Sequence, residues 1–136
     1  MSAAPEPRPV DEPVRMVEVI FPNQTNHYGT LFGGAALAMM DKAAFVAATR
    51  RARRALVTVA SDRVDFHAAA RSGEIVEVTA QVVRVGRTSL TVQVEVEAED
   101  LLTGERRSVT SGQFTFVALD AEGRPTPVPD VADPPG

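Results

Sequence analysis

A carboxylate stands in the most apolar helical stretch of the chain. Residues 34–53 have no proline and no internal glycine and are rich in alanine, methionine and leucine, which predicts one long helix carrying Asp41. The residues three and four positions from Asp41 include none that could neutralise it. A buried carboxylate usually becomes more basic or is hydrogen-bonded by other segments, so Asp41 could take a proton from water or attack an electrophile. Alternatively, Asp41 faces solvent or caps a loop.

Two glycines stand where this helix should begin. The first N–H groups of a helix have no partner within it, and Gly33 and Gly34 lack side chains that would keep a substrate carbonyl away. The pair could therefore hold an oxyanion, although close backbone packing also explains most Gly-Gly pairs. Asp41 follows Gly34 by about two turns, or about 10 Å along the axis. We therefore expect the Asp41 that faces a given Gly34 to belong to another subunit.

The elements around the helix read as strands. The sequence predicts strands at 14–20, 56–67, 74–85, 89–100 and 106–119. Residues 89–99 alternate strictly between polar and apolar, and short turns at 86–87 and 102–105 predict antiparallel hairpins. An apolar helix must be buried on most of its surface, so we expect an α+β hotdog fold, a curved antiparallel sheet of about five strands around one long central helix. Its exposed edge predicts dimerisation into a continuous sheet.

Composition limits the remaining possibilities. The 136 residues suit one domain, which we place at 14–119 between Pro-rich tails at 1–13 and 120–136. No cysteine, no signal peptide and no long apolar run are present, so a cytoplasmic protein without a membrane segment is expected. A net charge of −4 argues against nucleic acid. The arginines of "TRRARR" (49–54) suit a solvated helix end or a phosphorylated ligand.

Several enzyme classes lack their signatures. There is no G-x-S-x-G motif for a serine hydrolase and no phosphate-binding or dinucleotide fingerprint. Two separated histidines and no thiol give no metal-ligand spacing, so we expect no metal and no redox cofactor.

Six short motifs occur in a characteristic order. They are "NHYGTLFGG" (26–34), "MD" (40–41), "VTVA" (57–60), "VDFH" (64–67), "GRTS" (86–89) and "FTFVA" (114–118). Over about residues 14–130, including the "GRPTPVP" tail, the chain resembles the hotdog acyl-CoA thioesterases of the YciA and cytosolic acyl-CoA hydrolase type. The resemblance implies hydrolysis of an acyl-CoA to a free acid and coenzyme A, and a dimer at minimum, as a trimer of dimers.

The resemblance also implies residue roles. Asn26 and Asp41 would be catalytic and face each other from different subunits. Asp41 would activate water or attack the thioester, Asn26 would orient the water or carbonyl, and the N–H of Gly34 would stabilise the oxyanion. The chain departs from the family pattern at His27 and Tyr28, which could reshape the acyl entrance.

Further residues would bind the substrate by the same resemblance. Gly33, Phe66 and His67 would lie along the tunnel for the pantetheine arm, and His67 is expected to pack or hydrogen-bond rather than to act as a second base. The turn formed by Gly86, Arg87, Thr88 and Ser89 would hold phosphates of coenzyme A, although Arg87 also suits a plain surface turn. Residues 67–74 lack the proline that usually follows the strand, which leaves the nucleotide site's local shape open. A non-catalytic acyl-CoA-binding module (a sensor) is the alternative function, and acyl chain length is not determined.

Overall fold

The computed structural model describes residues 11–130, and its elements follow the predicted order. They are β1 (Val14–Val19), the short 3-10 helix η1 (Pro22–Gln24), α1 (Gly33–Ala52), β2 (Ala55–Phe66), β3 (Ile75–Val85), β4 (Ser89–Glu99) and β5 (Arg106–Leu119). All five predicted strands and the predicted helix are present, with ends shifted by at most one residue. Only η1, a single turn after Phe21, was not predicted.

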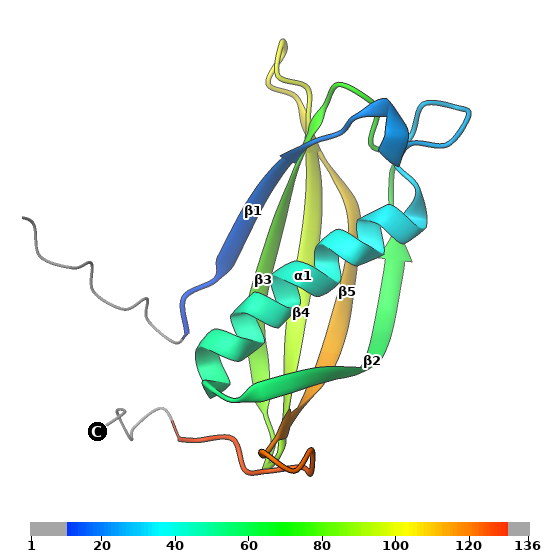
Figure 1. Cartoon of the computed structure of the whole chain (residues 1–136). Helices are drawn as coiled ribbons and strands as arrows, with labels where there is room; N and C mark the ends of the chain where they lie inside the picture. Colours follow the sequence, from blue (N-terminus) through cyan, green and yellow to red (C-terminus); the bar gives the residue numbers. More distant parts are fainter. Residues whose placement is uncertain (1–10, 131–136) are drawn as a thin grey trace, which may run out of the picture.

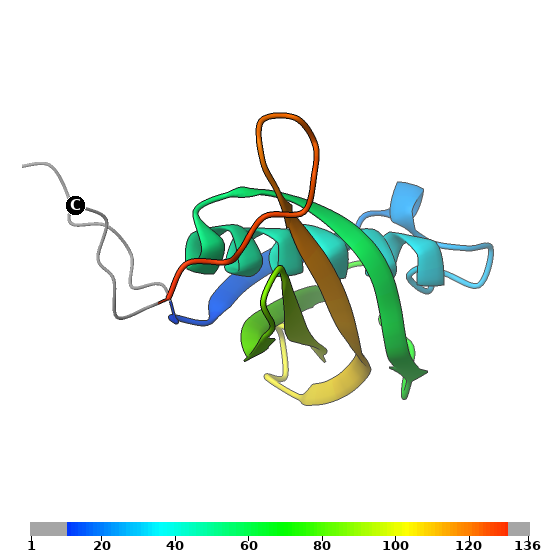
Figure 2. The same ribbon diagram turned by 90° about the horizontal axis from the view of Figure 1, so that it is seen from below.

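The strands form one antiparallel sheet in the order β1-β3-β4-β5-β2. Helix α1 lies diagonally across the concave face, with β1 on one side and β2 on the other (Figure 1). Seen from below, the sheet curves around the helix, and β2 arcs past it as the last strand (Figure 2). This is the predicted hotdog arrangement.

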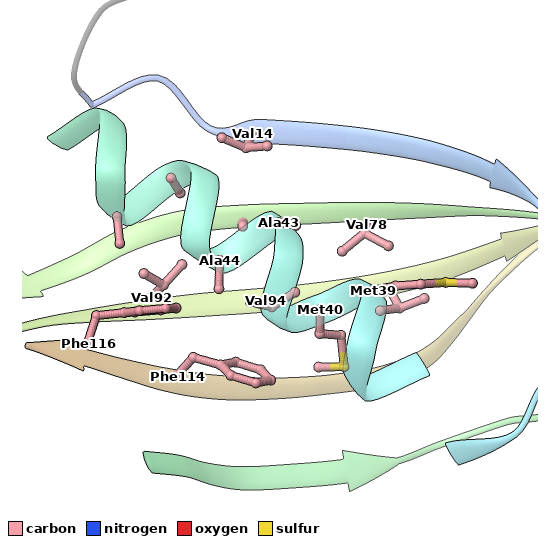
Figure 3. Close-up of a cluster of buried hydrophobic side chains, with 14 of the residues drawn as sticks. Val14, Met39, Met40, Ala43, Ala44, Val78, Val92, Val94, Phe114 and Phe116 are labelled. Carbon is pink, nitrogen blue, oxygen red and sulfur yellow. The ribbon is translucent and has the colours of Figure 1, made fainter. Parts of the chain in front are cut away.

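The core fills the space between α1 and the middle strands. On the strands it consists of the apolar halves of the alternating patterns, such as Val92 and Val94 in β4 and Phe114 and Phe116 in β5 (Figure 3). On the helix it consists of methionines and six alanines, the buried side chains Ala36, Met39, Met40, Ala43, Ala44, Ala47, Ala48 and Ala52. Alanine side chains are short, so the helix can approach the sheet closely while the phenylalanines and methionines fill the larger gaps.

One side of the helix and one edge of the sheet remain open in the single chain. Phe45 keeps 44% of its surface exposed, and Ala38 and Lys42 are exposed on neighbouring turns. In strand β2 only Leu56 is buried, with 8% of its surface exposed, and Val59 is 54% exposed. These apolar groups border the free backbone edge of β2, which is the kind of edge that a second chain commonly covers.

Strand β2 is less regular than its sequence suggested. Its pairing with β5 shifts register twice, between Thr58 and Ala60 and between Asp62 and Asp65, and Arg63 has a φ of 51°. Opposite the second irregularity stands Gly112, where a Cβ would lie 3.1 Å from Val64 Cγ2 and 3.3 Å from Met40 Cε. The missing side chain lets the irregular part of β2 approach both β5 and the helix, and so bends the strand around α1.

Part of the predicted C-terminal tail lies against the sheet and the end of the helix. Val128 packs on the core and its N–H donates to Arg87 O, while Arg51 Nη1 donates to Pro129 O over 2.7 Å. Residues 120–130 contain turns but no helix or strand. Residues 1–10 and 131–136, which hold most of the predicted tails, lie outside the described residues.

Candidate active site

Asp41 receives a hydrogen bond from the neighbouring edge strand. Thr58 Oγ1 of β2 donates to Asp41 Oδ1 over 2.9 Å, and Asp41 is half-buried between helix and strand. Asp41 thus has a hydrogen-bonding partner from another segment, which was one of the outcomes expected for a carboxylate on this helix. It was not identified from the sequence, although Thr58 lies in the "VTVA" motif. Its pairing with the buried Phe116 places Thr58 on the inner face of the sheet. A polar residue at an inward position of an apolar strand is the sequence feature that could have identified it.

The start of α1 offers unpaired backbone donors next to open space. The first hydrogen bond of the helix runs from Ala36 N to Phe32 O, and the N-cap residue Phe32 gives no side-chain acceptor. A Cβ built on Gly34 would meet nothing within 4 Å, whereas one on Gly33 would lie 3.5 Å from the ring of Phe66. Gly34 and Asp41 are seven residues apart, so they point within about 20° of each other around the helix axis. They share this face but stand about 10 Å apart along the axis, which is too far for one thioester carbonyl to meet both within a single chain.

Asn26 organises the loop that precedes the helix. Its Oδ1 accepts hydrogen bonds from Tyr28 N (3.0 Å), Thr30 N (3.2 Å) and Thr30 Oγ1 (3.1 Å). Because two of these partners are backbone donors, the oxygen must face the loop and the amide group NH2 must face away from it. That NH2 group has no partner among the described residues, so it is free to donate to a ligand.

No hydrogen bond joins Asn26 to Asp41 within the part of the chain that the structure describes. Asn26 bonds only inside its own loop, and Asp41 bonds to Thr58. Within one chain, the two predicted catalytic residues therefore make separate sets of contacts.

Phe66 and His67 follow each other at the end of β2 and point to different surroundings. Phe66 is 58% exposed and its ring lies beside Gly33. His67 Nε2 lies 3.2 Å from Ser111 Oγ, and Ser111 alternates with the inward residues of β5. The His67 ring is thus directed to the outer face of the sheet, which supports a hydrogen-bonding role for it over that of a second base.

The turn at residues 86–89 lies at the opposite end of the sheet from Gly33 (Figure 1). It is closed by a hydrogen bond from Gly86 N to Ser89 O, and the side chain of Arg87 is exposed. Strand β3 separates the two ends by about 33 Å, since the steps between its 11 successive residues each rise about 3.3 Å. One chain therefore holds Asn26, Gly33, Gly34 and Phe66 at one end, and Gly86, Arg87, Thr88 and Ser89 at the other. The contact between Asp41 and Thr58 lies away from the Gly33 end, because Thr58 pairs with Phe116, which pairs in turn with Leu90 next to the 86–89 turn.

Two other site types find no support in the described residues. Residues 11–130 contain no group of three His, Cys, Asp or Glu side chains placed to hold a metal ion. Within the same range, no helix has the length and apolar character needed to cross a membrane.

Comparison with known proteins gives consistent relatives. The family model described as "Thioesterase superfamily" matches residues 28–105. The uncharacterized acyl-CoA thioester hydrolase YkhA of Bacillus subtilis is 42% identical over 112 residues, which are 82% of this chain and 65% of YkhA. The chain thus spans just under two thirds of that relative's length.

Solved structures agree in fold. An acyl-CoA hydrolase of Staphylococcus aureus, solved with butyryl coenzyme A, coenzyme A and coenzyme A disulfide, is 34% identical with a TM-score of 0.82, over 86% of this chain and 71% of that one. A hexameric acyl-CoA thioesterase is 42% identical with a TM-score of 0.83, over 86% and 75% of the two chains. Alanine variants of one asparagine, one aspartate and one threonine of the S. aureus protein have also been solved. Because a model of one family matches more than half of its residues and a relative is 42% identical across most of it, this chain belongs to the thioesterase superfamily.

Proposed function

We propose that the protein hydrolyses the thioester of an acyl-CoA, releasing a free carboxylic acid and coenzyme A. The observation that carries the proposal is the pairing of Asp41 with Thr58 on the helix face that also presents the open N-terminus at Gly34. Membership of the thioesterase superfamily and similarity to proteins named acyl-CoA hydrolases support it. The S. aureus asparagine, aspartate and threonine are 15 and 17 positions apart, as are Asn26, Asp41 and Thr58.

Each residue has a role that follows from its contacts. Thr58 holds Oδ1 of Asp41, which leaves Oδ2 to accept a proton from water or to attack the thioester carbonyl carbon itself. In the first case the water oxygen bonds to that carbon and its proton moves to Asp41. The carbonyl oxygen becomes an oxyanion held by the N–H of Gly34, and collapse of this intermediate expels the coenzyme A thiolate, which is then protonated. The free NH2 group of Asn26 donates to the water or carbonyl and orients it.

The site is completed between subunits. Asn26 and Asp41 do not contact each other in one chain, and the turn at 86–89 lies about 33 Å from the end of the sheet that holds Gly33 and the Asn26 loop. A second chain seated on the open edge of β2 would cover the exposed apolar residues and extend the sheet. We therefore propose a dimer as the smallest active unit and a trimer of dimers as the full assembly, and the existence of a hexameric relative supports an assembly of six chains.

Substrate contacts follow from the same arrangement. Gly33 and Phe66 would line the path of the acyl-pantetheine arm, and His67 would contribute through its hydrogen bond to Ser111. Gly86, Arg87, Thr88 and Ser89 would hold phosphate groups of coenzyme A. The mechanism needs no metal or redox cofactor, and we place the enzyme in the cytoplasm.

The test is thiol release from a panel of acyl-CoAs by the wild type, Asp41→Ala and Asn26→Ala. We expect turnover by the wild type and a large loss of kcat in both variants, with the fold retained. Binding of coenzyme A without turnover of any acyl-CoA would instead establish a sensor. An Asp41→Ala variant with full activity would remove Asp41 from the mechanism.

A further inference from the structure

An ion pair outside the candidate site joins β5 to the start of β3. Arg107 donates through Nη1 to Glu74 Oε2 (2.8 Å) and through Nη2 to Glu74 Oε1 (2.6 Å), a two-pronged arrangement. The side chain of Glu74 is only 11% exposed and that of Arg107 26% exposed. The two hydrogen bonds constrain the orientation of the carboxylate in addition to the attraction between the opposite charges. The pair therefore requires a more closely defined geometry than a surface salt bridge.

The same two side chains hold both ends of the turn at residues 69–74. Arg107 Nε donates to Ala69 O (3.0 Å), and Glu74 Oε1 accepts from Arg71 N (2.7 Å). The turn is closed by Glu74 N donating to Arg71 O, and Gly73, with a φ of 91°, donates its N–H to Ile20 O. Segment 69–74 has no helix or strand of its own, so the ion pair is a principal constraint on its shape.

The 69–74 turn supports the loop that contains Asn26. Leu31 N donates to Ala70 O over 2.8 Å and Ser72 N donates to Gly29 O over 3.0 Å. Thr30, which bonds to Asn26 Oδ1 through its N–H and its hydroxyl, forms an isolated bridge with Arg71. The residues that hold the Asn26 side chain are therefore hydrogen-bonded to a turn whose ends are fixed by Glu74 and Arg107.

We propose that Glu74 and Arg107 are positioning residues for Asn26, acting through the 69–74 turn on the placement of its free amide group. The inference rests on the proposed role of Asn26 in thioester hydrolysis. Neither residue touches the substrate. Displacement of a reacting or orienting group by about 1 Å can lower a rate by about 100-fold. Glu74 and Arg107 can therefore affect kcat even though they act on Asn26 only through the 69–74 turn.

The electrostatics of the pair agree with this role. The hydrogen bond from Arg107 is the main cause that lowers the pKa of Glu74, and it outweighs the opposing effect of burial. Arg71 lowers the pKa of Glu74 further. Glu74 is thus ionised near neutral pH, when the hydrogen bonds to Arg107 and Arg71 N are at full strength.

The neighbouring residue offers a matched control. Arg106 also bonds to carboxylates, donating to Glu97 Oε2 (2.7 Å) and Glu99 Oε1 (2.9 Å), but these groups lie on the exposed outer face of the sheet. Among residues 11–130, the side chain of Arg106 hydrogen-bonds to Glu77, Glu97 and Glu99 and not to the 69–74 turn. Arg107→Gln and Arg106→Gln therefore remove the same charge from adjacent positions, and only the first removes support from the Asn26 loop.

The experiment measures kcat and KM for Arg107→Gln, Glu74→Gln and Arg106→Gln, each alone and combined with Asn26→Ala. We expect Arg107→Gln and Glu74→Gln to lower kcat by about 10- to 100-fold with little change in KM, and Arg106→Gln to stay within about twofold. In the Asn26→Ala background the first two substitutions should cause no further loss, because the group they position is gone. An equal loss of kcat in both backgrounds would overturn the proposal.

A second measurement does not depend on activity. Hydrogen exchange at the Leu31 and Tyr28 amides should be at least about 10-fold faster in Arg107→Gln than in Arg106→Gln, with the amides of β4 equally protected in both. Unchanged exchange at these amides would also overturn the proposal, even if the wild type hydrolysed no acyl-CoA. If Arg107→Gln failed to fold, Arg107→Lys would take its place, since it keeps the charge but loses the two-pronged geometry.

Discussion

Replacing Gly34 by alanine should separate stability from activity. Gly34 is the second residue of α1, its φ lies outside the left-handed region, and the added methyl would meet nothing within 4 Å. Alanine stabilises a helix interior by about 1 kcal/mol relative to glycine, and we take about half of this for the first turn. For a chain of this length the gain corresponds to a melting temperature higher by about 2 °C. The fold should therefore become slightly more stable.

Activity should change in the opposite direction. The methyl would occupy the space through which a thioester oxygen approaches the Gly34 N–H. Loss of one oxyanion donor costs about 100- to 1,000-fold in kcat, and a methyl that hinders approach without removing the donor should cost at least about 10-fold. Because the variant is predicted to be the more stable protein, such a loss could not be ascribed to unfolding.

The assay pairs thermal unfolding, followed by circular dichroism, with thiol release from the best acyl-CoA substrate. A Gly34→Ala enzyme with a raised melting temperature and unchanged kcat would refute the reasoning, because it would show that no reacting atom comes close to this backbone. A lowered melting temperature would contradict the open space seen around Gly34.

Four further results are expected. Thr58→Val should lower kcat by about 10-fold through loss of the hydrogen bond to Asp41, and Thr58→Ser should retain most activity; equal rates for both would exclude a role for the hydroxyl. Gly112→Ala should destabilise the fold by about 1–3 kcal/mol, since its methyl would crowd Val64 and Met40, and an unchanged urea midpoint would contradict this contact. The pKa of Glu74 is held below its ordinary value of 4.5, so its contribution to stability is present above pH 4.5 and is lost as the pH falls through the lowered value. The melting-temperature difference between wild type and Glu74→Gln should therefore shrink on acidification below pH 4.5, and a constant difference would argue against an ionic contribution. Light scattering should detect a dimer or hexamer, and a stable monomer would contradict the shared site.

The fold was largely predictable because its signals are local. The alternation of Ser89–Glu99 identifies β4 and its buried face, and the unbroken alanine- and methionine-rich run identifies α1. The turns predicted at 86–87 and 102–105 then make β3, β4 and β5 neighbours, as observed. Asn26, Gly34 and Asp41 belong to one continuous segment, so their types and spacing were readable as well.

The irregular features of β2 were not predictable in this way. Its second register shift, between Asp62 and Asp65, lies opposite Gly112 of β5, which is far along the chain from Val64. A bulge in one strand is accommodated by a missing side chain in its neighbour, and periodicity within one strand carries no record of that neighbour. The bulged course of β2 therefore followed only from the folded sheet.

The sequence by itself determined which residues could do chemistry, because residue type, spacing and helical period are properties of a single segment. The tertiary structure alone decided how these residues are held. It brings Thr58 to Asp41 across 17 positions and Arg107 to Glu74 across 33. Hydrogen bonds of this kind depend on the relative placement of whole elements within a few tenths of an ångström, and that placement is set by the packing of the entire core.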